Sequence, residues 1–325
     1  MHPVTPAQPP LVSVVIPTWN GRHHLEVCLP ALFRQTYTPF EVIVVDNGSH
    51  DGTLAWLARK WPSVRVVALR RNYGVARAFN EGVKAARGAF VALLNNDTEP
   101  EPNWLAALVE VFDRHPEAGM AASKIRLWDD RRRLHAAGDY YTRSGRPGNR
   151  GVWEVDEGQY DVEADVFGPC GAAAMYRREL FDDVGLFDER FGSYLEDVDL
   201  AWRAQRAGWR CVYTPGAVVY HKISATGGGP LASFYTGRNW IYVLAKDYPA
   251  PLLRRYWRQI LHEQWNVTRE ALRAWRGAAA RARLRGQVMG LLGIPRMLLA
   301  RREVTARTRV SVARLDSLLA APSEQ

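Results

Sequence analysis

Three carboxylates, Glu196, Asp197 and Asp199, lie within four positions in residues 191–209, FGSYLEDVDLAWRAQRAGW. Apolar residues recur at helical spacing after them and a glycine follows, so a helix is predicted to begin at this cluster. Acidic residues are ordinary in a first helical turn, because unpaired N–H groups and the helix dipole favour anions there. Asp199 lies four residues before Arg203 and is predicted to pair with it along the helix surface. Glu196 and Asp197 remain as candidates for acid–base chemistry.

The first hundred residues alternate between predicted strands and predicted helices. Val-rich apolar runs bounded by turn residues predict buried strands at residues 11–17, 40–46, 64–69 and 89–95. Apolar spacings of three and four predict helices between them, at residues 23–35, 51–61 and 74–88. This order is typical of an α/β fold with a mostly parallel central sheet covered by helices on both faces.

Farther along the chain the patterns are weaker. A helix is predicted at residues 104–115, and a loop or hairpin at residues 129–158. Residues 165–191 suggest a strand, a small-residue segment and a helix that contains Arg177, and residues 211–221 suggest two short strands.

The four early strands end in or run into segments rich in polar residues, which contain Pro17, Thr18 and Asn20; Asp46; Arg71 and Asn72; and Asn95, Asn96 and Asp97. The carboxyl ends of parallel strands meet at one edge of a sheet, where ligands bind in such folds. One polar strand end is typical of a turn, but four at the same edge indicate a site for a polar, phosphorylated ligand. The chain has no GxGxxG after its first strand and no GxxxxGK[ST], which disfavours a Rossmann dinucleotide site and a P-loop.

Five motifs, in order, resemble those of the inverting glycosyltransferases of family 2, which have the GT-A fold. They are VSVVIPTWNG, VVDNGSHDGT, RNYGVARAFNEG, LLNNDTEP and YLEDVDLAWR, and the resemblance covers residues 11–239. The sequence from GLFDERF to GAVVYH is most similar to the sequences of a bacterial branch of the family that contains rhamnosyltransferases. The resemblance implies an enzyme that moves a sugar from a nucleotide-diphosphate donor to a hydroxyl of a cell-surface polysaccharide or lipid-linked saccharide.

Sugar transfer of this kind requires neutralisation of the charge that grows on the diphosphate, which a divalent cation supplies. Mg²⁺ or Mn²⁺ is usually held by one or two carboxylates plus the phosphates, and the resemblance implies Asp97 as that carboxylate. Asn95 stands where the family's DxD motif begins, so the site has one charge fewer. His221 resembles a histidine that completes the metal site in some members, and the alternative is a surface histidine at a strand end.

The resemblance also implies acid–base and nucleotide contacts. Asp197 has the position of the general base, and Glu196 either raises the pKa of Asp197 by like-charge repulsion or binds the acceptor. A simple N-terminal cap is the alternative for Asp197. Asp46 is expected to accept hydrogen bonds from the base or ribose, or else to cap the next helix, a role that we assign to Asp51. The other residues expected at the nucleotide are Pro17, Thr18, Asn20, Arg71, Asn72, Asn95 and Asn96.

Two segments are expected near the acceptor. GPCGAAA, residues 168–174, is similar to the family's small-residue loop, in which Gly171 lets the backbone approach the sugar closely. SATGGGP, residues 224–230, has glycine hinges suited to a lid. Arg238 would bind a diphosphate of the donor or of a lipid-diphosphate acceptor, or else it is an arginine in solvent at a helix start.

Charge divides the chain at about residue 245. Residues 246–325 hold 16 Lys or Arg and 6 Asp or Glu, whereas the first 245 residues hold 27 and 28, and the net charge is +9. We expect a disordered segment at residues 1–10, a GT-A domain at 11–245 and a basic amphipathic helical tail at 246–325. Trp257, Trp265 and Trp275 among Arg and Leu favour an anionic membrane surface over nucleic acid as the partner. A solvated surface, or a homodimer contact through the tail, is the alternative.

The remaining expectations concern compartment and substrate. Three scattered cysteines, no signal-peptide pattern and no long apolar run predict a cytoplasmic protein, peripheral at the inner face of the cell membrane. The resemblance to the rhamnosyltransferase branch favours dTDP-L-rhamnose as donor; a UDP-linked galactofuranosyl, glucosyl or N-acetylglucosaminyl group is the alternative. A sugar-phosphate nucleotidylyltransferase is disfavoured, because PTWNGRHH is a poor match to its phosphate loop. A non-catalytic nucleotide-binding, membrane-docking protein would be expected to lack base carboxylates, which this chain has.

Overall fold

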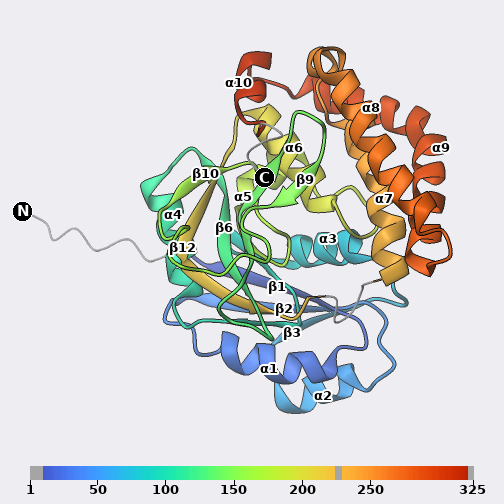
Figure 1. Cartoon of the computed structure of the whole chain (residues 1–325). Helices are drawn as coiled ribbons and strands as arrows, with labels where there is room; N and C mark the ends of the chain where they lie inside the picture. Colours follow the sequence, from blue (N-terminus) through green and yellow to red (C-terminus); the bar gives the residue numbers. More distant parts are fainter. Residues whose placement is uncertain (1–9, 224–228, 321–325) are drawn as a thin grey trace, which may run out of the picture.

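The computed structural model describes residues 10–223 and 229–320 (Figure 1). The segment predicted to be disordered, apart from Pro10, and residues 224–228 of the predicted lid therefore lie outside the described residues. The early alternation of strands and helices is confirmed. Four strands are parallel, β1 (Val12–Thr18), β2 (Phe40–Asp46), β3 (Arg65–Ala68) and β4 (Phe90–Leu94), and they alternate in the chain with α1 (Arg22–Leu32), α2 (Thr53–Lys60) and α3 (Val75–Ala85).

The second half of the sheet is mixed. The strand order is β10-β12-β6-β11-β4-β1-β2-β3. In addition, β5 pairs with β12, and β7 pairs with β6. β11 is antiparallel to both of its neighbours, whereas β12 is parallel to β6. These strands are β5 (Thr98–Pro100), β6 (Ala118–Leu127), β7 (Leu134–Ala137), β10 (Ala164–Val166), β11 (Ala173–Arg177) and β12 (Arg210–His221). The hairpin alternative for residues 129–158 is confirmed by β8 (Asp139–Tyr141) and β9 (Pro147–Asn149), which pair with each other.

Two assignments in this half are corrected. The small-residue segment runs into β11, and Arg177 ends that strand instead of lying in a helix. The small side chains of Ala173 and Ala174 are fully buried at the level of the neighbouring strands, and this packing overrides the helical preference of alanine. Residues 211–221 lie in one strand, not two. Its pairing with β6 shifts between Thr214 and Val218, where Pro215 has no N–H to donate to the ladder.

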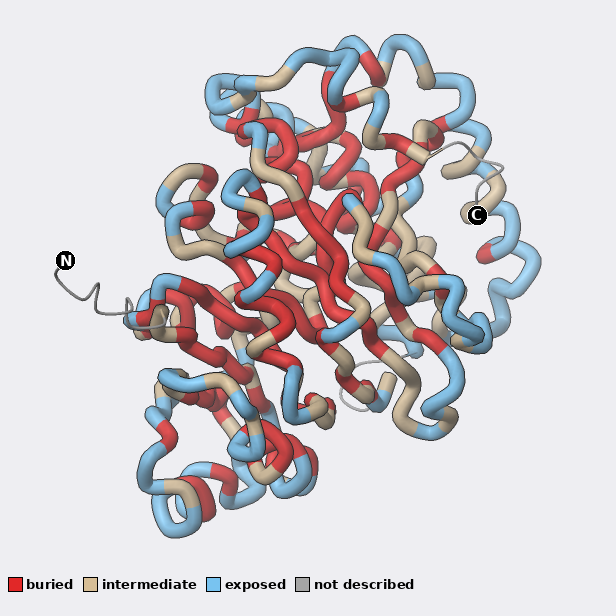
Figure 2. Tube along the Cα trace, turned by 90° about the vertical axis from the view of Figure 1, so that its left-hand side faces the viewer, coloured by how far each residue is buried: buried red, intermediate tan, exposed pale blue. Residues whose placement is uncertain are grey.

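Both faces of the sheet are buried, as predicted. Val14 and Ile16 of β1 belong to a core with α1, α2 and α4 (Trp104–Arg114). Val15 belongs to a second core with α3, α5 (Arg178–Val184) and α6 (Glu196–Ala207). Neighbouring residues of a strand point to opposite faces, which explains the alternation. Figure 2 shows buried segments of the chain in the interior and exposed segments around them.

The C-terminal region is helical and packs on the body. It contains α7 (Gly229–Lys246), α8 (Ala250–Arg273), α9 (Ala278–Ala306) and α10 (Val312–Ser317). α9 packs closely along α7 because glycines of α9 face the α7 backbone. A Cβ at Gly290 would lie 3.0 Å from the carbonyl oxygen of Arg238. Ile260 of α8 and Leu315 of α10 are buried in the same core as Trp202 of α6. The predicted division at residue 245 falls inside α7.

Within residues 10–223 and 229–320, no helix combines the length and the apolar character needed to cross a membrane.

Candidate active site

Asp46 ends β2 at the edge of the sheet where the parallel strands finish, and it is fully buried. Its Oδ2 accepts a hydrogen bond from the Ser49 N–H (3.1 Å), whereas its Oδ1 is buried with no hydrogen-bond partner among the described residues. A buried acceptor without a donor costs free energy, so a ligand N–H or O–H would be stabilised at Oδ1. Asp51 accepts from the Thr53 N–H (3.1 Å) at the start of α2, although the cap position itself is Gly52.

The loop after β3 is fastened to the loop after β2 by a residue that the sequence did not single out. Asn47 is buried, and its Nδ2 donates to Asn72 Oδ1 (3.0 Å) and to the Gly74 carbonyl (3.1 Å). Its Oδ1 accepts from the Tyr73 N–H (3.0 Å). Arg71 is exposed, and its guanidinium lies 4.9 Å from the centre of the Tyr73 ring. An asparagine directly after a buried strand was the only available signal for this role.

The other residues predicted at the nucleotide cross-link the strand ends. Asn96 Nδ2 donates to Thr18 Oγ1 (2.8 Å), and both residues are buried. Asn20 donates its N–H to Ser49 Oγ (2.8 Å) and accepts from the His50 N–H (2.7 Å), which joins the loops after β1 and β2. The last two positions with this prediction are Pro17, next to the end of β1, and Asn95, directly after β4.

Asp97 and His221 meet because β5 pairs with β12, which places His221 opposite Thr98. The Asp97 Oδ1 lies 3.3 Å from His221 Nε2 and is buried with no hydrogen-bond partner in the described part of the chain. His221 is also buried, so the alternative of a surface histidine is not supported. A cavity of about 120 Å³ lies beside Asp97 and is lined also by His24 and Trp128.

His135 of β7 is a further member of this cluster that the sequence did not indicate. Its Nδ1 lies 3.0 Å from His221 Nδ1, so one ring orients the other. Burial, followed by the nearby His221, lowers the pKa of His135 to about 3, and this ring is therefore neutral at physiological pH. A neutral imidazole beside a metal-binding histidine fixes the orientation of that ring.

The donor set at Asp97 fits a cation that shares its coordination with phosphate. No three His, Cys, Asp or Glu side chains of the described ranges form a metal-binding group. One carboxylate and one imidazole are too few to enclose a cation, but Mg²⁺ and Mn²⁺ commonly take one or two protein ligands plus substrate phosphates. The unpaired Asp97 Oδ1 is the acceptor oxygen that such an arrangement needs.

Glu196 and Asp197 open α6, and Gly208 ends it with a φ of 99°. Asp197 is held through both carboxylate oxygens: Oδ2 accepts from the Gly171 N–H (2.9 Å) and Oδ1 from the Val198 N–H (2.8 Å). A Cβ at Gly171 would lie 3.0 Å from Asp197 Oδ2. The small-residue loop is thus needed for a close approach, but here the approach is to the predicted base.

Burial sets the protonation of the acidic pair. It raises the pKa of Glu196 well above its ordinary value, and the charge of Asp197 raises it further. Burial also raises the pKa of Asp197, while the N–H groups of Gly171 and Val198 oppose this rise. The direction predicted for Asp197 is confirmed, but its leading cause is desolvation instead of repulsion by Glu196. Glu196 Oε2 is buried with no partner among the described residues, so a ligand donor would be stabilised there as well.

Tyr194 connects the acidic pair to the Asp97 cluster. Burial raises the pKa of Tyr194, and the charges of Glu196 and Asp97 add to the effect. Tyr194 and Leu195 have positive φ values of 65° and 63°, a conformation that is costly for residues other than glycine. The segment before α6 is therefore strained, and other residues must hold it.

Two neighbouring residues of α7 hold that segment. Asn239, fully buried, donates through Nδ2 to the carbonyls of Phe191 (3.0 Å), Ser193 (2.9 Å) and Tyr194 (2.6 Å). Arg238 donates through Nη2 to the carbonyls of Arg190 (3.0 Å) and Phe191 (2.5 Å). Arg238 is thus neither in open solvent nor at a helix start. On the other side of the segment, the Gly192 carbonyl accepts from the Ala76 N–H (2.9 Å) of α3.

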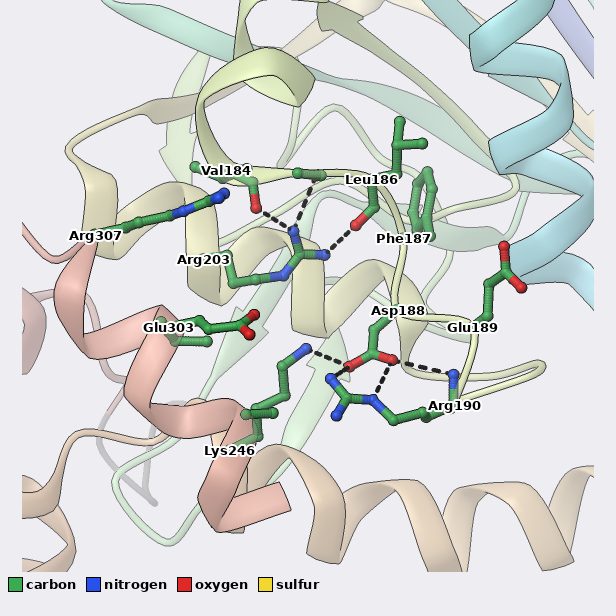
Figure 3. Close-up of a pocket in the computed structure, with 13 residues that line it drawn as sticks. Val184, Leu186, Phe187, Asp188, Glu189, Arg190, Arg203, Lys246, Glu303 and Arg307 are labelled. Atoms are coloured by element: carbon green, nitrogen blue, oxygen red, sulfur yellow. Dashed lines mark hydrogen bonds and ion pairs between the residues drawn. The ribbon is translucent and has the colours of Figure 1, made fainter. Parts of the chain in front are cut away.

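Asp199 pairs with Arg203, as predicted, but the pair is buried and not on the surface. Arg203 donates through Nε (2.9 Å) and Nη2 (2.7 Å) to Asp199 Oδ2, and Lys246 contacts the other oxygen. Lys246 also binds Asp188 (2.6 Å). Figure 3 shows Arg203 pointing at the backbone carbonyls of residues 184–186 beside a cavity of about 310 Å³. All these cations are paired, so the network holds α5, α6 and α7 together.

Comparisons with known proteins agree with this geometry. Residues 13–185 match the family model described as "Glycosyl transferase family 2". The chain is 30% identical over 259 residues to the N-acetylglucosaminyl-diphospho-decaprenol L-rhamnosyltransferase of Mycobacterium tuberculosis, which covers 73% of this chain and 84% of the relative. It is 31% identical to the O-antigen biosynthesis protein RfbC of Myxococcus xanthus, over 67% of this chain but only 18% of that protein.

Solved structures show the same fold. GalNAc-T7 with UDP, GalNAc and Mn²⁺ aligns with a TM-score of 0.60 and 18% identity, over 73% of this chain and 48% of that one. The mannosyltransferase PcManGT from Pyrobaculum calidifontis, in complex with GDP-Man and Mn²⁺, aligns with a TM-score of 0.56 and 19% identity, over 93% of this chain and 87% of that one. This chain spans less than half of the GalNAc-T7 chain, and the likeness concerns the fold.

Proposed function

Because this chain belongs to glycosyl transferase family 2 and has the GT-A fold, we propose that it catalyses inverting sugar transfer from a nucleotide-diphosphate donor to an acceptor hydroxyl. The observation that carries the proposal is the acidic pair at the start of α6. Asp197 is held by two backbone N–H groups and is raised in pKa by burial, which suits a residue that accepts a proton. The charges of Glu196 and Asp97 both raise the pKa of Tyr194, which supports a single site for these residues.

The proposed roles follow from the unpaired acceptors. Asp197 takes the proton of the acceptor hydroxyl, and Glu196 accepts a hydrogen bond from the acceptor through its free Oε2. Asp46 Oδ1 accepts from the nucleobase or the ribose, and Arg71 supplies positive charge from the next loop. Asp97 and His221 would hold the divalent cation, which neutralises the leaving diphosphate when bound.

Thr18, Asn20, Asn72 and Asn96 contribute by fixing the loops around Asp46, since their side chains are engaged with neighbouring loops. Asn47 belongs with them. Gly171 holds the base, and Arg238 acts through the segment before α6. A diphosphate contact for Arg238 would require its guanidinium to leave the carbonyls of residues 190 and 191.

The donor that we propose is dTDP-L-rhamnose, with a UDP-linked hexose as the alternative. Its support is the 30% identity to a relative named as an L-rhamnosyltransferase. That relative's name also contains a diphospho-decaprenol, and by analogy we propose a lipid-linked saccharide as acceptor here. We propose accordingly that the protein works at the inner face of the cell membrane.

Thermal unfolding with UDP, dTDP and GDP, each with and without Mn²⁺, tests the nucleotide and the cation. A ligand that binds the native state raises the midpoint by mass action. We expect a shift of several degrees with dTDP that requires Mn²⁺ and is absent in Asp97→Ala, followed by transfer of rhamnose from dTDP-L-rhamnose to a polyprenyl-diphosphate-linked saccharide.

Each other result has a definite meaning. A shift with UDP but not dTDP would replace the proposed donor and keep the reaction. A dTDP shift that is the same without Mn²⁺ would remove Asp97 and His221 as metal ligands. No shift with any nucleotide, together with no transfer, would overturn the proposed function.

A further inference from the structure

The outer sides of α8 and α9 carry large apolar side chains in rows. On α8, Trp257, Leu261 and Trp265 follow one another at spacings of four and are 50%, 59% and 59% exposed, and Leu272 continues the row. Residues spaced by four lie on one face of a helix. Single exposed apolar residues are common in folded proteins, but a contiguous row of this kind marks an interaction site.

α9 presents a second row on the side that faces away from the body. Its inner side packs on α7 through Gly286 and Gly290, where an added Cβ would meet the α7 backbone. On its other side the exposed apolar residues are Val288, Met289, Leu291, Leu292, Leu298 and Leu299. Their spacings of three, four and seven follow the helical period.

The two rows flank one seam. Gln287 Nε2 of α9 donates to Thr268 Oγ1 of α8 (2.9 Å), which joins the helices at that point. Trp265 lies three residues before Thr268, and Leu291 lies four residues after Gln287, so each is a surface neighbour of a seam residue. We call the exposed apolar residues of both helices the α8–α9 face. Figure 1 shows the two helices at the outer edge of the molecule.

Charge indicates what covers this face. Residues 250–306 contain 12 Arg and no Lys, with 3 Glu and no Asp. Arg254, Arg258 and Arg269 are exposed beside the α8 row, and the Arg258 guanidinium lies 5.4 Å from the centre of the Trp257 ring. A second copy of this chain would bring arginines against arginines, which is repulsive. Tryptophan and arginine beside leucine instead suit the boundary between anionic headgroups and acyl chains.

We propose that the α8–α9 face is a docking surface for an anionic lipid bilayer. Trp257, Leu261 and Trp265, with the leucines of α9, enter the headgroup boundary, and the flanking arginines bind lipid phosphates. The proposal deepens the proposed function, because it names the surface that brings the protein to a lipid-linked acceptor. The docked helix α9 packs on α7, whose Asn239 holds the segment before Asp197. The acceptor site is thus one helix away from the docked surface.

Co-sedimentation of the full chain with vesicles tests this directly. We expect binding to vesicles of phosphatidylglycerol and phosphatidylcholine that weakens as salt rises, and little binding to phosphatidylcholine alone. The triple variant Trp257→Ala, Leu261→Ala, Trp265→Ala should lower the vesicle partition coefficient at least tenfold. Trp153→Ala, which removes a tryptophan that is 58% exposed elsewhere, is the matched control and should bind normally.

The readouts separate docking from folding and from the reaction. The triple variant changes only exposed side chains, so its unfolding midpoint and its response to nucleotide should match those of the parent protein. Vesicle binding that the triple variant retains would overturn the proposal. So would a parent dimer in solution that the triple variant converts to monomer, because the face would then be a subunit contact. Loss of docking with transfer to a water-soluble acceptor intact would leave the proposed function standing.

Discussion

The backbone contacts of Asp197 make it the position where a single atom matters most. In Asp197→Asn the base is removed, and the one remaining side-chain oxygen still accepts from the Gly171 N–H, whereas the contact with the Val198 N–H is lost because an amide nitrogen cannot accept it. We expect kcat to fall on the order of 10²–10⁴-fold with the donor KM nearly unchanged, the usual size of a lost general base. Steady-state kinetics with circular dichroism as the folding control checks this. A loss confined to KM would show that Asp197 binds substrate without accepting the proton.

The same residue sets the expected pH dependence. A general base works only when ionised, and burial raises the pKa of Asp197 above its ordinary value of 3.8. The value of kcat/KM should therefore rise with pH, with a midpoint above that ordinary value, and it should level off once Asp197 is ionised. The Asp197→Asn variant should lack this limb. A parent profile that is flat down to pH 4 would contradict the raised pKa.

Glu196 allows a prediction about stability. Its pKa in the fold is raised by burial and by Asp197, so the folded state binds this proton more tightly than the unfolded state does. The carboxyl favours folding while it is protonated, and it opposes folding increasingly as pH rises from the unfolded pKa towards the folded one. Glu196→Gln should therefore increase the free energy of unfolding at pH 8 by on the order of 1 kcal/mol.

This gain should be smaller at pH 5 than at pH 8, because the parent carboxyl becomes protonated as pH falls. Urea unfolding at the two pH values measures the difference, and Glu270→Gln on the exposed side of α8 is the matched control, with no gain expected. A Glu196→Gln variant that is less stable at both pH values would show that a buried contact outweighs the charge.

At the scale of elements, the sequence was most informative where a strong pattern coincided with a local cause. β2 runs from Phe40 to Asp46 as predicted, because a Val-rich run ends at a turn signal. The pattern failed where distant packing decides the conformation. The sequence predicts two strands where the structure has the single strand β12. Pro215 interrupts the pairing, and nothing in the local sequence indicates that pairing resumes at Val218.

The prediction of the site succeeded and failed for the same reasons. Polar strand ends predicted one edge of the sheet, and resemblance, not spacing, brought Asp97 and His221 together across more than a hundred residues. His135, Asn47 and Tyr194 were missed, because their roles depend on partners from other elements: His221, Asn72 and the acidic pair. Single-sequence patterns carry no signal for such pairings, whereas the β5–β12 register explains the Asp97–His221 contact once it is seen.

The α7 helix gives a prediction at this scale. Asn239→Ala removes three hydrogen bonds to the segment before α6 and frees Tyr194 and Leu195 from their positive φ values. We expect a fall in kcat on the order of 10-fold or more, with the nucleotide-induced shift of the unfolding midpoint little changed, because Asn239 makes no hydrogen bond to the loops around Asp46. The free energy of unfolding of Asn239→Ala should be lower by on the order of 1–3 kcal/mol, as expected for lost buried hydrogen bonds.

The matched control is Thr236→Ala, one turn earlier on the same helix, whose hydroxyl donates only to the Ala232 carbonyl. It should leave kcat unchanged. If Asn239→Ala lowered stability but kept the parent kcat, the segment would be structural and would not position Asp197.

At the scale of the whole molecule, the division by charge at residue 245 is not a division of the core. Ile260 is 5% exposed and lies in the core that includes Trp202, whereas its neighbour Leu261 is 59% exposed. If tail and body unfold as one unit, Ile260→Ala should lower the free energy of a single transition by about 2–4 kcal/mol, and Leu261→Ala by less than about 0.5 kcal/mol. Urea unfolding followed by tryptophan fluorescence and circular dichroism distinguishes the cases. Two separate transitions, with only one shifted by Ile260→Ala, would show that the basic tail is an independent domain resting on the body.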